Sequence, residues 1–400
     1  MPGSSSAHDH FLSRSYFPAL DGLRCLAISA VIFHHSTSRP LPGWLGRGHL
    51  GVQLFFAISG FLITTLLLRE LRETSTIALR RFWLRRSLRI FPLYYAVLGA
   101  FALFTESSGG GPAQAQFWHN LPYFASYTCN WFVNYGVPHA VVFGFAWSLA
   151  TEEQFYALWP LLIRALRRIR WVVLALLTLI VVDQLAERGR LAFLLGRHSA
   201  LESVVTSFSP SIALGALFAL GLEGRYARFL SRLLGHRAAL PACATLAALL
   251  VARPIEPFLC FEFVLAALVA AAALRAQSPR GELLASAGLT AVGRASYGMY
   301  LFHVPVIGAL RRLFPEFSGS PGALFVVALP TTFALASASY RWLEAPFLRL
   351  RSQVAAGRLV SRPALGAAAT EQIALRSSVA TSRRTEEPAA AFELDRARVD

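Results

Sequence analysis

The chain contains no lysine, so all 38 of its basic residues are arginine. Charged residues make up only 15% of the 400 residues, whereas about a quarter is typical of a soluble globular domain. Hydrophobic residues make up 55% of the chain, which excludes an ordinary soluble domain. The shortage of charge therefore indicates a multi-pass membrane protein.

Cysteine is also scarce, with four residues in the whole chain. Cys25, Cys129, Cys243 and Cys260 show no paired spacing, and three of them fall in apolar segments of the kind that cross membranes. This pattern indicates neither a disulfide framework nor a metal site. We therefore expect no metal cofactor.

Ten apolar segments approach the length of about 20 residues that a helix needs to cross the bilayer. They lie at residues 20–37, 51–68, 90–104, 141–163, 171–185, 204–222, 238–252, 258–274, 294–310 and 322–343. The segments 90–104 and 238–252 are shorter, so either could instead be a re-entrant or buried piece. The sequence predicts an all-α, polytopic bundle of about ten transmembrane helices.

The net charge of +16 would suit a nucleic-acid-binding protein, but the arginines are concentrated in alternate connections between the apolar segments. They fill the second, fourth and sixth connections, whereas residues 105–141 contain none. Arginine-rich connections normally stay in the cytoplasm, which places both termini there and residues 105–141 outside. We therefore expect a multi-pass protein of the plasma membrane, surrounded by lipid and without a nucleic-acid partner.

The two ends of the chain differ from its apolar middle. Residues 1–16 are polar and lack the layout of a cleaved signal, so we expect a short cytoplasmic segment there. From residue 352 onward the chain consists mainly of Ala, Arg, Ser and Glu without apolar periodicity. Residues 352–400 are therefore predicted to be a disordered cytoplasmic tail, and residues 17–351 to be the membrane domain.

Two ionisable residues stand out on the first apolar segment, Arg24 and His35. Eleven steps of about 100° return to within about 20°, so both share one helix face, about 16 Å apart along the axis. Asp21 lies close to the same face. Ionisable groups inside a membrane usually face the bundle interior or a polar cavity, which indicates a functional site. The alternative is an arginine that reaches the interface and a hydrogen-bonded structural histidine.

The fourth apolar segment carries two adjacent acids, Glu152 and Glu153, in its outer half. Ser148, Glu152 and Trp159 share one helix face, so a carboxylate with polar and aromatic neighbours is expected to point into the bundle. The alternative is a packing ion pair between helices. Two adjacent acids exceed what a single pair requires, which favours a functional role.

An arginine-rich run at residues 85–92 includes Arg86 and Arg89 and ends where the third span is predicted to begin. Guanidinium groups match phosphate oxygens in a two-pronged geometry, so this run could bind phosphates. Arginines at a cytoplasmic helix end are also what membrane orientation alone requires. From these residues by themselves, orientation is the better explanation.

A polar stripe also runs along the ninth apolar segment. Ser296, Tyr300 and His303 are spaced to share one helix face, with Pro305 just beyond. This stripe could be a polar packing seam or the wall of a substrate site.

Taken together and in this order, these runs resemble the acyltransferase 3 family of integral-membrane acyltransferases. Leu20 to Arg24 with His35 is similar to the family's first-helix Arg–His motif. The other matching runs are GVQLFFAISGF at 51–61, RSLRIFP at 86–92, WSLATEEQFY at 147–156, SYGMYLFH at 296–303, and Arg341 with Glu344 and Pro346. The resemblance extends from about Phe17 to Leu348.

The resemblance implies a bacterial inner-membrane enzyme that modifies hydroxyl groups of surface glycans or small molecules. The donor is commonly an acyl-CoA such as acetyl-CoA, reached from the cytoplasm, and the saccharide or small-molecule acceptor is presented on the other side. Arg86 and Arg89 then become candidates for donor phosphate binding.

Roles for the other site residues follow as hypotheses from the same resemblance. His35 would act as general base or transient acyl carrier, with Glu152 or Glu153 orienting or reprotonating it. Arg24 would offset negative charge on the thioester oxygen. The remaining polar residues of the two stripes would contact substrate, namely Ser148, Ser296, Tyr300 and His303.

A polytopic transporter is the main alternative. Buried histidine and glutamate residues can relay protons while a bundle moves a substrate without covalent change. The sequence contains no convincing inverted repeat, and the spacing of its charged residues follows the acyltransferase pattern, so we favour the enzyme.

Overall fold

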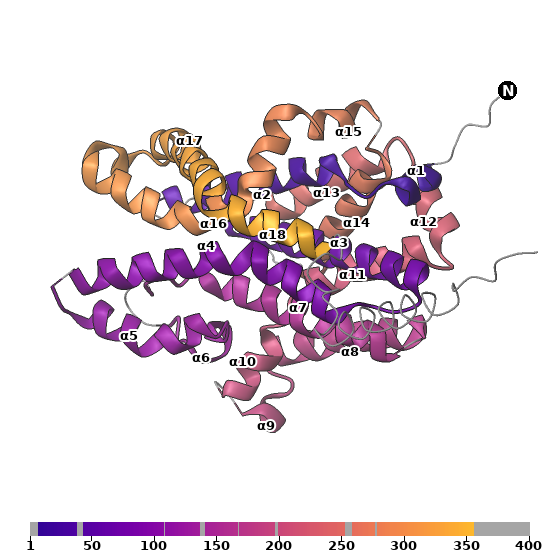
Figure 1. Ribbon diagram of the computed structural model, residues 1–400, viewed down its shortest axis with the longest axis horizontal. Coiled ribbons are helices and arrows are strands. Elements are labelled where there is room, and N and C mark those ends of the chain that lie inside the picture. Colours follow the sequence, from indigo (N-terminus) through magenta and orange to yellow (C-terminus); the bar gives the residue numbers. More distant parts are fainter. Residues whose placement is uncertain are drawn as a thin grey trace, which may run out of the picture.

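Helices make up the regular structure of the computed structural model, and the described residues contain no strand (Figure 1). The described ranges are 7–37, 43–107, 109–136, 141–166, 168–196, 199–252, 258–276 and 278–355. Residues 356–400, which are most of the predicted tail, and residues 1–6 lie outside these ranges. The part of the predicted N-terminal segment that is described contains a short helix, α1 (Ala7–Ser13), on which Phe11 is buried.

Each of the ten apolar segments overlaps a helix, although segment 204–222 begins in a preceding short helix and includes a break at residues 207–209. The ten helices are α2 (Pro18–Ser36), α3 (Gly51–Thr74), α4 (Leu79–Ser107), α7 (Ala146–Leu166), α8 (Ile169–Glu187), α11 (Pro210–Glu223), α13 (Ala239–Ala252), α14 (Phe258–Leu274), α16 (Ala287–Leu313) and α17 (Pro321–Ser339). Short helices connect them: η1 (Gly43–Leu50), α5 (Pro112–Ala125), α6 (Cys129–Phe132), α9 (Ala192–Leu195), α10 (Ala200–Thr206), α12 (Ala227–Leu234), α15 (Pro279–Leu284), η2 (Pro315–Gly319), η3 (Tyr340–Glu344) and α18 (Ala345–Ala355).

By length and composition, five helices among the described residues could cross a membrane, or seven if two bent helix pairs each count as one span. The bent pairs are α1 with α2, at 85°, and α12 with α13, at 73°. The three other predicted spans are α14, a shorter apolar helix, and α7 and α16, which are long enough but carry polar site residues. A membrane helical bundle is thus supported, and ten crossings stay a prediction.

One predicted boundary is wrong. The arginine-rich run was expected in a connection before a span at 90–104, whereas α4 begins at Leu79 and includes Arg86 and Arg89. Arginine is a good helix former, so the charged run continues the helix instead of breaking it. These side chains therefore project from a rigid element into the protein.

Glycines allow the central helices to approach closely. A Cβ atom on Gly60 of α3 would lie 2.0 Å from the Ile212 carbonyl oxygen of α11, and one on Gly293 of α16 would lie 1.8 Å from the Asp21 carbonyl oxygen of α2. Small residues at such crossings let membrane helices pack backbone to backbone. The crossing at Gly293 holds α16 directly against the part of α2 that carries Arg24.

The arginine-rich connections gather at one end of the bundle. Arg69 at the end of α3 donates to Glu223 at the end of α11 (2.8 Å), and Arg164 of α7 donates to the Ile77 carbonyl oxygen between α3 and α4 (3.5 Å). Figure 1 shows α1 and α12 near this end, at the right of the view, and α5 and α6 toward the opposite end. The two kinds of connection predicted to face opposite sides of the membrane therefore lie at opposite ends of the molecule.

Candidate functional site

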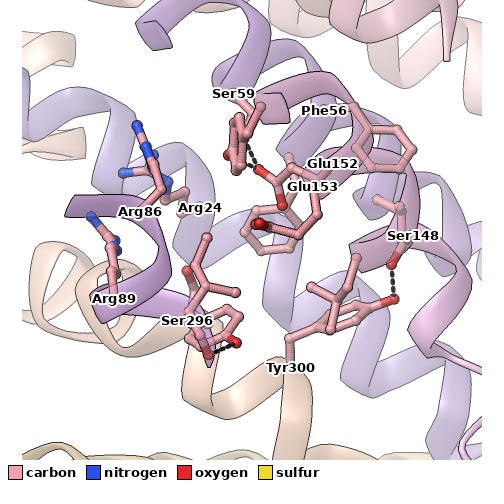
Figure 2. A pocket seen from close by; sticks show the side chains of 16 residues that line it. Arg24, Phe56, Ser59, Arg86, Arg89, Ser148, Glu152, Glu153, Ser296 and Tyr300 are labelled. Atoms are coloured by element: carbon pink, nitrogen blue, oxygen red, sulfur yellow. Dashed lines mark hydrogen bonds between the residues drawn. The ribbon is translucent and has the colours of Figure 1, made fainter. Parts of the chain in front are cut away.

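A cavity between α2, α3, α4, α7 and α16, called here the central cavity, is lined by 16 residues (Figure 2). Eight of the ten site residues predicted from the sequence are among them. These eight are Arg24, Arg86, Arg89, Ser148, Glu152, Glu153, Ser296 and Tyr300. The separate polar stripes of the sequence thus converge on one space inside an apolar bundle.

One side of the central cavity is basic. Figure 2 shows Arg24, Arg86 and Arg89 gathered there, and a second cavity, the arginine cavity, continues beyond them with Arg294 and Arg351 in its wall. Within the part of the chain that the structure describes, only Arg24 of these five forms an ion pair with a carboxylate. The arginine cavity thus has five guanidinium groups against two carboxylates, Asp21 and Glu344, and such an excess of positive charge is suited to an anionic ligand.

Arg24 of α2 is held by Asp21 on the same helix and, through Asp21, by Tyr16 just before that helix. Its guanidinium donates to Asp21 (2.7 Å), and the hydroxyl of Tyr16 donates to the other oxygen of the same carboxylate (2.5 Å). Asp21 is only 3% exposed, which makes this ion pair stronger than a surface pair would be. Arg24 is therefore held in place at the boundary between the central and arginine cavities.

The opposite side of the central cavity carries the two acids. The hydroxyls of Ser59 and Tyr156 both donate to Glu152, and the Arg86 guanidinium lies over the Tyr156 ring at 4.7 Å from its centroid. Glu153 also lines the cavity. Glu152 is thus the acid that hydroxyl donors hold in place, whereas no such donor contacts Glu153 among the described residues.

The two substrate-site stripes meet at a hydroxyl pair. The Ser148 and Tyr300 oxygens are 2.6 Å apart, and Tyr300 also donates to the Phe145 carbonyl oxygen (3.1 Å). Next to this pair, Tyr297 donates to the Ile90 carbonyl oxygen (2.7 Å) and joins α16 to α4. Ser296 is buried in the wall of the central cavity.

His35 and His303 are the two predicted site residues that do not line the central cavity. Their rings contact each other with centroids 4.7 Å apart, and the His303 ring lies 5.2 Å from that of Tyr300. The expected direct link between His35 and an acid is not formed, because the hydrogen bonds of Glu152 go to Ser59 and Tyr156. A series of side-chain contacts instead runs from His35 through His303 and Tyr300 to Ser148.

The hydrogen bonding of His35 leaves one ring nitrogen available. Its Nδ1 lies 3.0 Å from the Val31 carbonyl oxygen, which can only accept, so Nδ1 carries the proton. In the neutral ring, Nε2 then has the lone pair. His35 lines a large, mainly apolar cavity, called here the apolar cavity, and the neighbouring His34 does not. Of the two adjacent histidines, His35 is therefore the one that faces this cavity.

Several residues of these cavities were not predicted from the sequence. Ser59 and Tyr156 belong to the runs 51–61 and 147–156, so their positions were flagged but their roles were not. Arg294 and Arg351 carry no sequence signal, because only packing brings their helices to the arginine cavity.

Arg341 and Glu344, which belong to the last run of the resemblance, form no ion pair with each other in the described structure. The chain forms a π-helical turn at η3, where Ser339 donates to Glu344 (3.5 Å) and Glu344 lines the arginine cavity. Such turns change which side a residue faces and often occur at functional sites.

A polar cavity with arginines and carboxylates inside an apolar helical bundle is typical of a membrane-embedded enzyme or transporter. A family model described as an acyltransferase domain matches residues 17–341, and the chain belongs to the acyltransferase 3 family. This assignment favours the enzyme over the transporter.

Two bacterial relatives illustrate the match. Peptidoglycan O-acetyltransferase OatA of Listeria monocytogenes is 26% identical over 371 residues, covering 84% of this chain and 56% of OatA. YrhL of Bacillus subtilis, provisionally named as a peptidoglycan O-acetyltransferase, is 28% identical over 359 residues, covering 83% of this chain and 55% of YrhL. The chain therefore spans just over half the length of these relatives. No solved structure matches it.

Proposed function

We propose that the protein is a membrane O-acyltransferase that moves an acyl group, with acetyl as the first choice, from acyl-CoA to a saccharide hydroxyl. The observation that carries this proposal is the arginine cavity, whose excess positive charge opens directly onto the central cavity with its two carboxylates. The names of the relatives support an O-acetyl group and a glycan acceptor.

The arginine cavity is the proposed donor site. Coenzyme A carries several phosphates, and Arg86 and Arg89 present guanidinium groups to this cavity from rigid α4. The arginine-rich end of the bundle is expected to face the cytoplasm, where acyl-CoA is found. This orientation puts both termini in the cytoplasm of a cell whose plasma membrane the protein crosses about ten times.

Arg24 is better suited to the donor than to the reacting carbonyl at His35. The two residues are about 16 Å apart along α2, and Arg24 shares the arginine cavity with Arg86 and Arg89. We therefore propose that Arg24 helps to bind the donor while the acceptor hydroxyl, deprotonated by His35, attacks the acyl carbon. Arg24 would stabilise negative charge on the thioester oxygen only at an earlier stage, while the acyl group still lies in the central cavity.

His35 is the proposed base. Its Nε2 would accept the proton of the acceptor hydroxyl while that oxygen forms a bond to the acyl carbon, and the carbon–sulfur bond breaks to release CoA thiolate. Transient transfer of the acyl group to His35 itself is the second form of the same proposal. The contacts through His303 and Tyr300 to Ser148 link this histidine to the cavity of Glu152.

The test is a CoA-release assay on the purified protein in lipid nanodiscs. With labelled acetyl-CoA and a soluble peptidoglycan fragment, we expect CoA release and acetylated product only when the acceptor is present. A transporter would move its substrate without producing CoA, so the absence of acceptor-dependent CoA release would contradict the proposal and favour the transporter.

A further inference from the structure

A further cavity, called here the side cavity, lies at the end of the bundle opposite the arginine-rich connections. Its walls come from the N-terminal ends of α3, α7, α11 and α14, the C-terminal end of α8, and α6 and α10. None of its residues has a role in the proposed reaction. Two of them are acids, Glu187 and Glu262, and most of the others bear hydroxyl, amide or aromatic groups.

Glu262 is a buried acid in the wall of this cavity, beside Ser211 of α11. It is only 4% exposed on the otherwise apolar helix α14, and its Oε2 atom has no hydrogen-bond partner within the described residues. Leaving a buried acceptor unsatisfied costs about 1–3 kcal/mol, and more if it is charged. The unsatisfied oxygen of Glu262 therefore favours a ligand that donates hydrogen bonds.

The surrounding groups narrow the chemistry of that ligand. In the described part of the chain no arginine pairs with Glu187 or Glu262, and these acids do not form a cluster able to hold a metal ion. Two acids would repel a phosphate or another anion. Gln53 and Asn130 add amide groups, and Phe56 and Trp147 add aromatic faces. Carboxylates, amides and aromatic faces together suit a neutral molecule with many hydroxyl groups.

The side cavity also adjoins the proposed reaction path. Phe56 lines both the side and central cavities, while Tyr135 and Trp147 line both the side and apolar cavities. The rings of Phe56 and Trp147 meet edge to face, 6.1 Å apart. Because His35 also lines the apolar cavity, the side cavity shares wall residues with the cavity of the proposed base.

We propose that the side cavity binds a neutral sugar unit of the saccharide acceptor and so positions the hydroxyl to be acylated. This inference rests on the proposed acyl transfer to a saccharide. Glu262 and Glu187 accept hydrogen bonds from sugar hydroxyls, and Trp147 and Phe56 pack against the apolar face of the ring. The residues thereby act as specificity-determining groups, separate from the donor site at the other end of the bundle.

The direct test measures saccharide binding without donor. The protein in nanodiscs is titrated by isothermal calorimetry with fully N-acetylated chitotriose, a neutral oligosaccharide called chitotriose below. We expect Glu262→Gln to weaken binding by about 10-fold and Glu262→Leu by more, since a hydrogen bond to a charged group typically contributes about 1.5–3 kcal/mol. The control Glu282→Gln, an exposed acid on α15 outside the cavities, should bind as the wild type does.

Both Glu262 variants should melt at or above the wild-type temperature, because an unsatisfied buried carboxylate is removed, and this measurement excludes misfolding as the cause. Chitotriose that fails to bind the wild type, or that binds Glu262→Leu equally well, overturns the proposal.

A second readout separates this proposal from the proposed function. If the wild type transfers the acyl group but Glu262→Gln leaves the acceptor KM unchanged, the side cavity is not the acceptor site and the acyltransferase function stands. If saccharide binding depends on Glu262 but no acceptor releases CoA from acetyl-CoA, the function is wrong and the side cavity is still a saccharide site. An increase in acceptor KM with an unchanged donor KM supports both.

Discussion

At the scale of single residues, adjacent side chains of the same type have different hydrogen-bond partners. In the histidine doublet, His35 directs Nδ1 to the Val31 carbonyl oxygen and lines a cavity, whereas His34 directs Nδ1 to the Gly46 carbonyl oxygen (3.1 Å). In the acid pair, Glu152 is held by two hydroxyls. Neighbours in sequence therefore have different environments.

Replacing the proposed base tests this distinction. His35→Gln should reduce acceptor-dependent CoA release by about 10²–10⁴-fold, the usual contribution of a general base. His34→Gln is the matched control, since it changes the adjacent ring that does not line the cavity, and it should retain activity near the wild-type level. Retained activity in His35→Gln with His34 intact would contradict the assignment.

The donor arginines make a separate prediction. Replacing Arg86 and Arg89 together with glutamine should raise the donor KM by 10-fold or more, because each charge-assisted hydrogen bond is worth about 1.5–3 kcal/mol. Arg80→Gln on the same helix is the control, because Arg80 is exposed and outside both cavities. Steady-state kinetics with varied acetyl-CoA measures the effect. An unchanged donor KM would mean that these arginines serve membrane orientation only.

At the scale of helices, close backbone contacts at glycine set the positions of the site residues. Gly293 packs α16 on the Asp21 carbonyl oxygen, and the same two helices carry Arg24 and Tyr300. The crossing of α3 and α11 at Gly60 fixes the neighbouring Ser59, which donates to Glu152. The geometry of the cavity therefore depends on packing between helices, at glycines that do not touch the substrate.

This packing predicts opposite effects for two alanine substitutions on α16. Gly293→Ala should lower stability by about 1–3 kcal/mol, because its Cβ would overlap the α2 backbone. Gly308→Ala has open space around the new Cβ and should be neutral or stabilising by up to about 1 kcal/mol, owing to alanine's higher helix propensity. Thermal unfolding in detergent measures both. Equal melting temperatures would show that the α2–α16 crossing is looser than described.

At the scale of the whole molecule, the arginine-rich connections and the arginine cavity lie toward one end, while α5, α6 and the side cavity lie toward the other. We infer a donor side and an acceptor side joined by the contacts between His35 and Ser148. A transfer path that crosses the membrane would let a cytoplasmic thioester acylate a glycan outside the cell.

Cysteine accessibility tests that orientation. In a variant without native cysteines, Ser126→Cys after α5 should react with a membrane-impermeant maleimide in intact cells. Thr76→Cys between α3 and α4 should react only after the membrane is opened, and both side chains are exposed. Labelling of Thr76→Cys in intact cells would contradict the proposed orientation, because the arginine cavity would then not face the cytoplasm.

The helical elements, and eight of the 16 residues that line the central cavity, could be predicted from the sequence alone. Apolar segments satisfy their backbone groups as helices in lipid, so hydropathy predicted a helix in each of the ten segments, whereas ten membrane crossings stay a prediction. Polar residues inside such helices are costly, which is why Arg24, Glu152 and Tyr300 were recognised.

Only the tertiary structure decided which of these residues share a cavity. Helical periodicity places a side chain on a face of its own helix but says nothing about which helix that face meets. Helix packing brought Arg294 and Arg351 to the arginine cavity, placed His35 against His303 instead of an acid, and created the side cavity around Glu262. These are long-range contacts, which have no local signature in the chain.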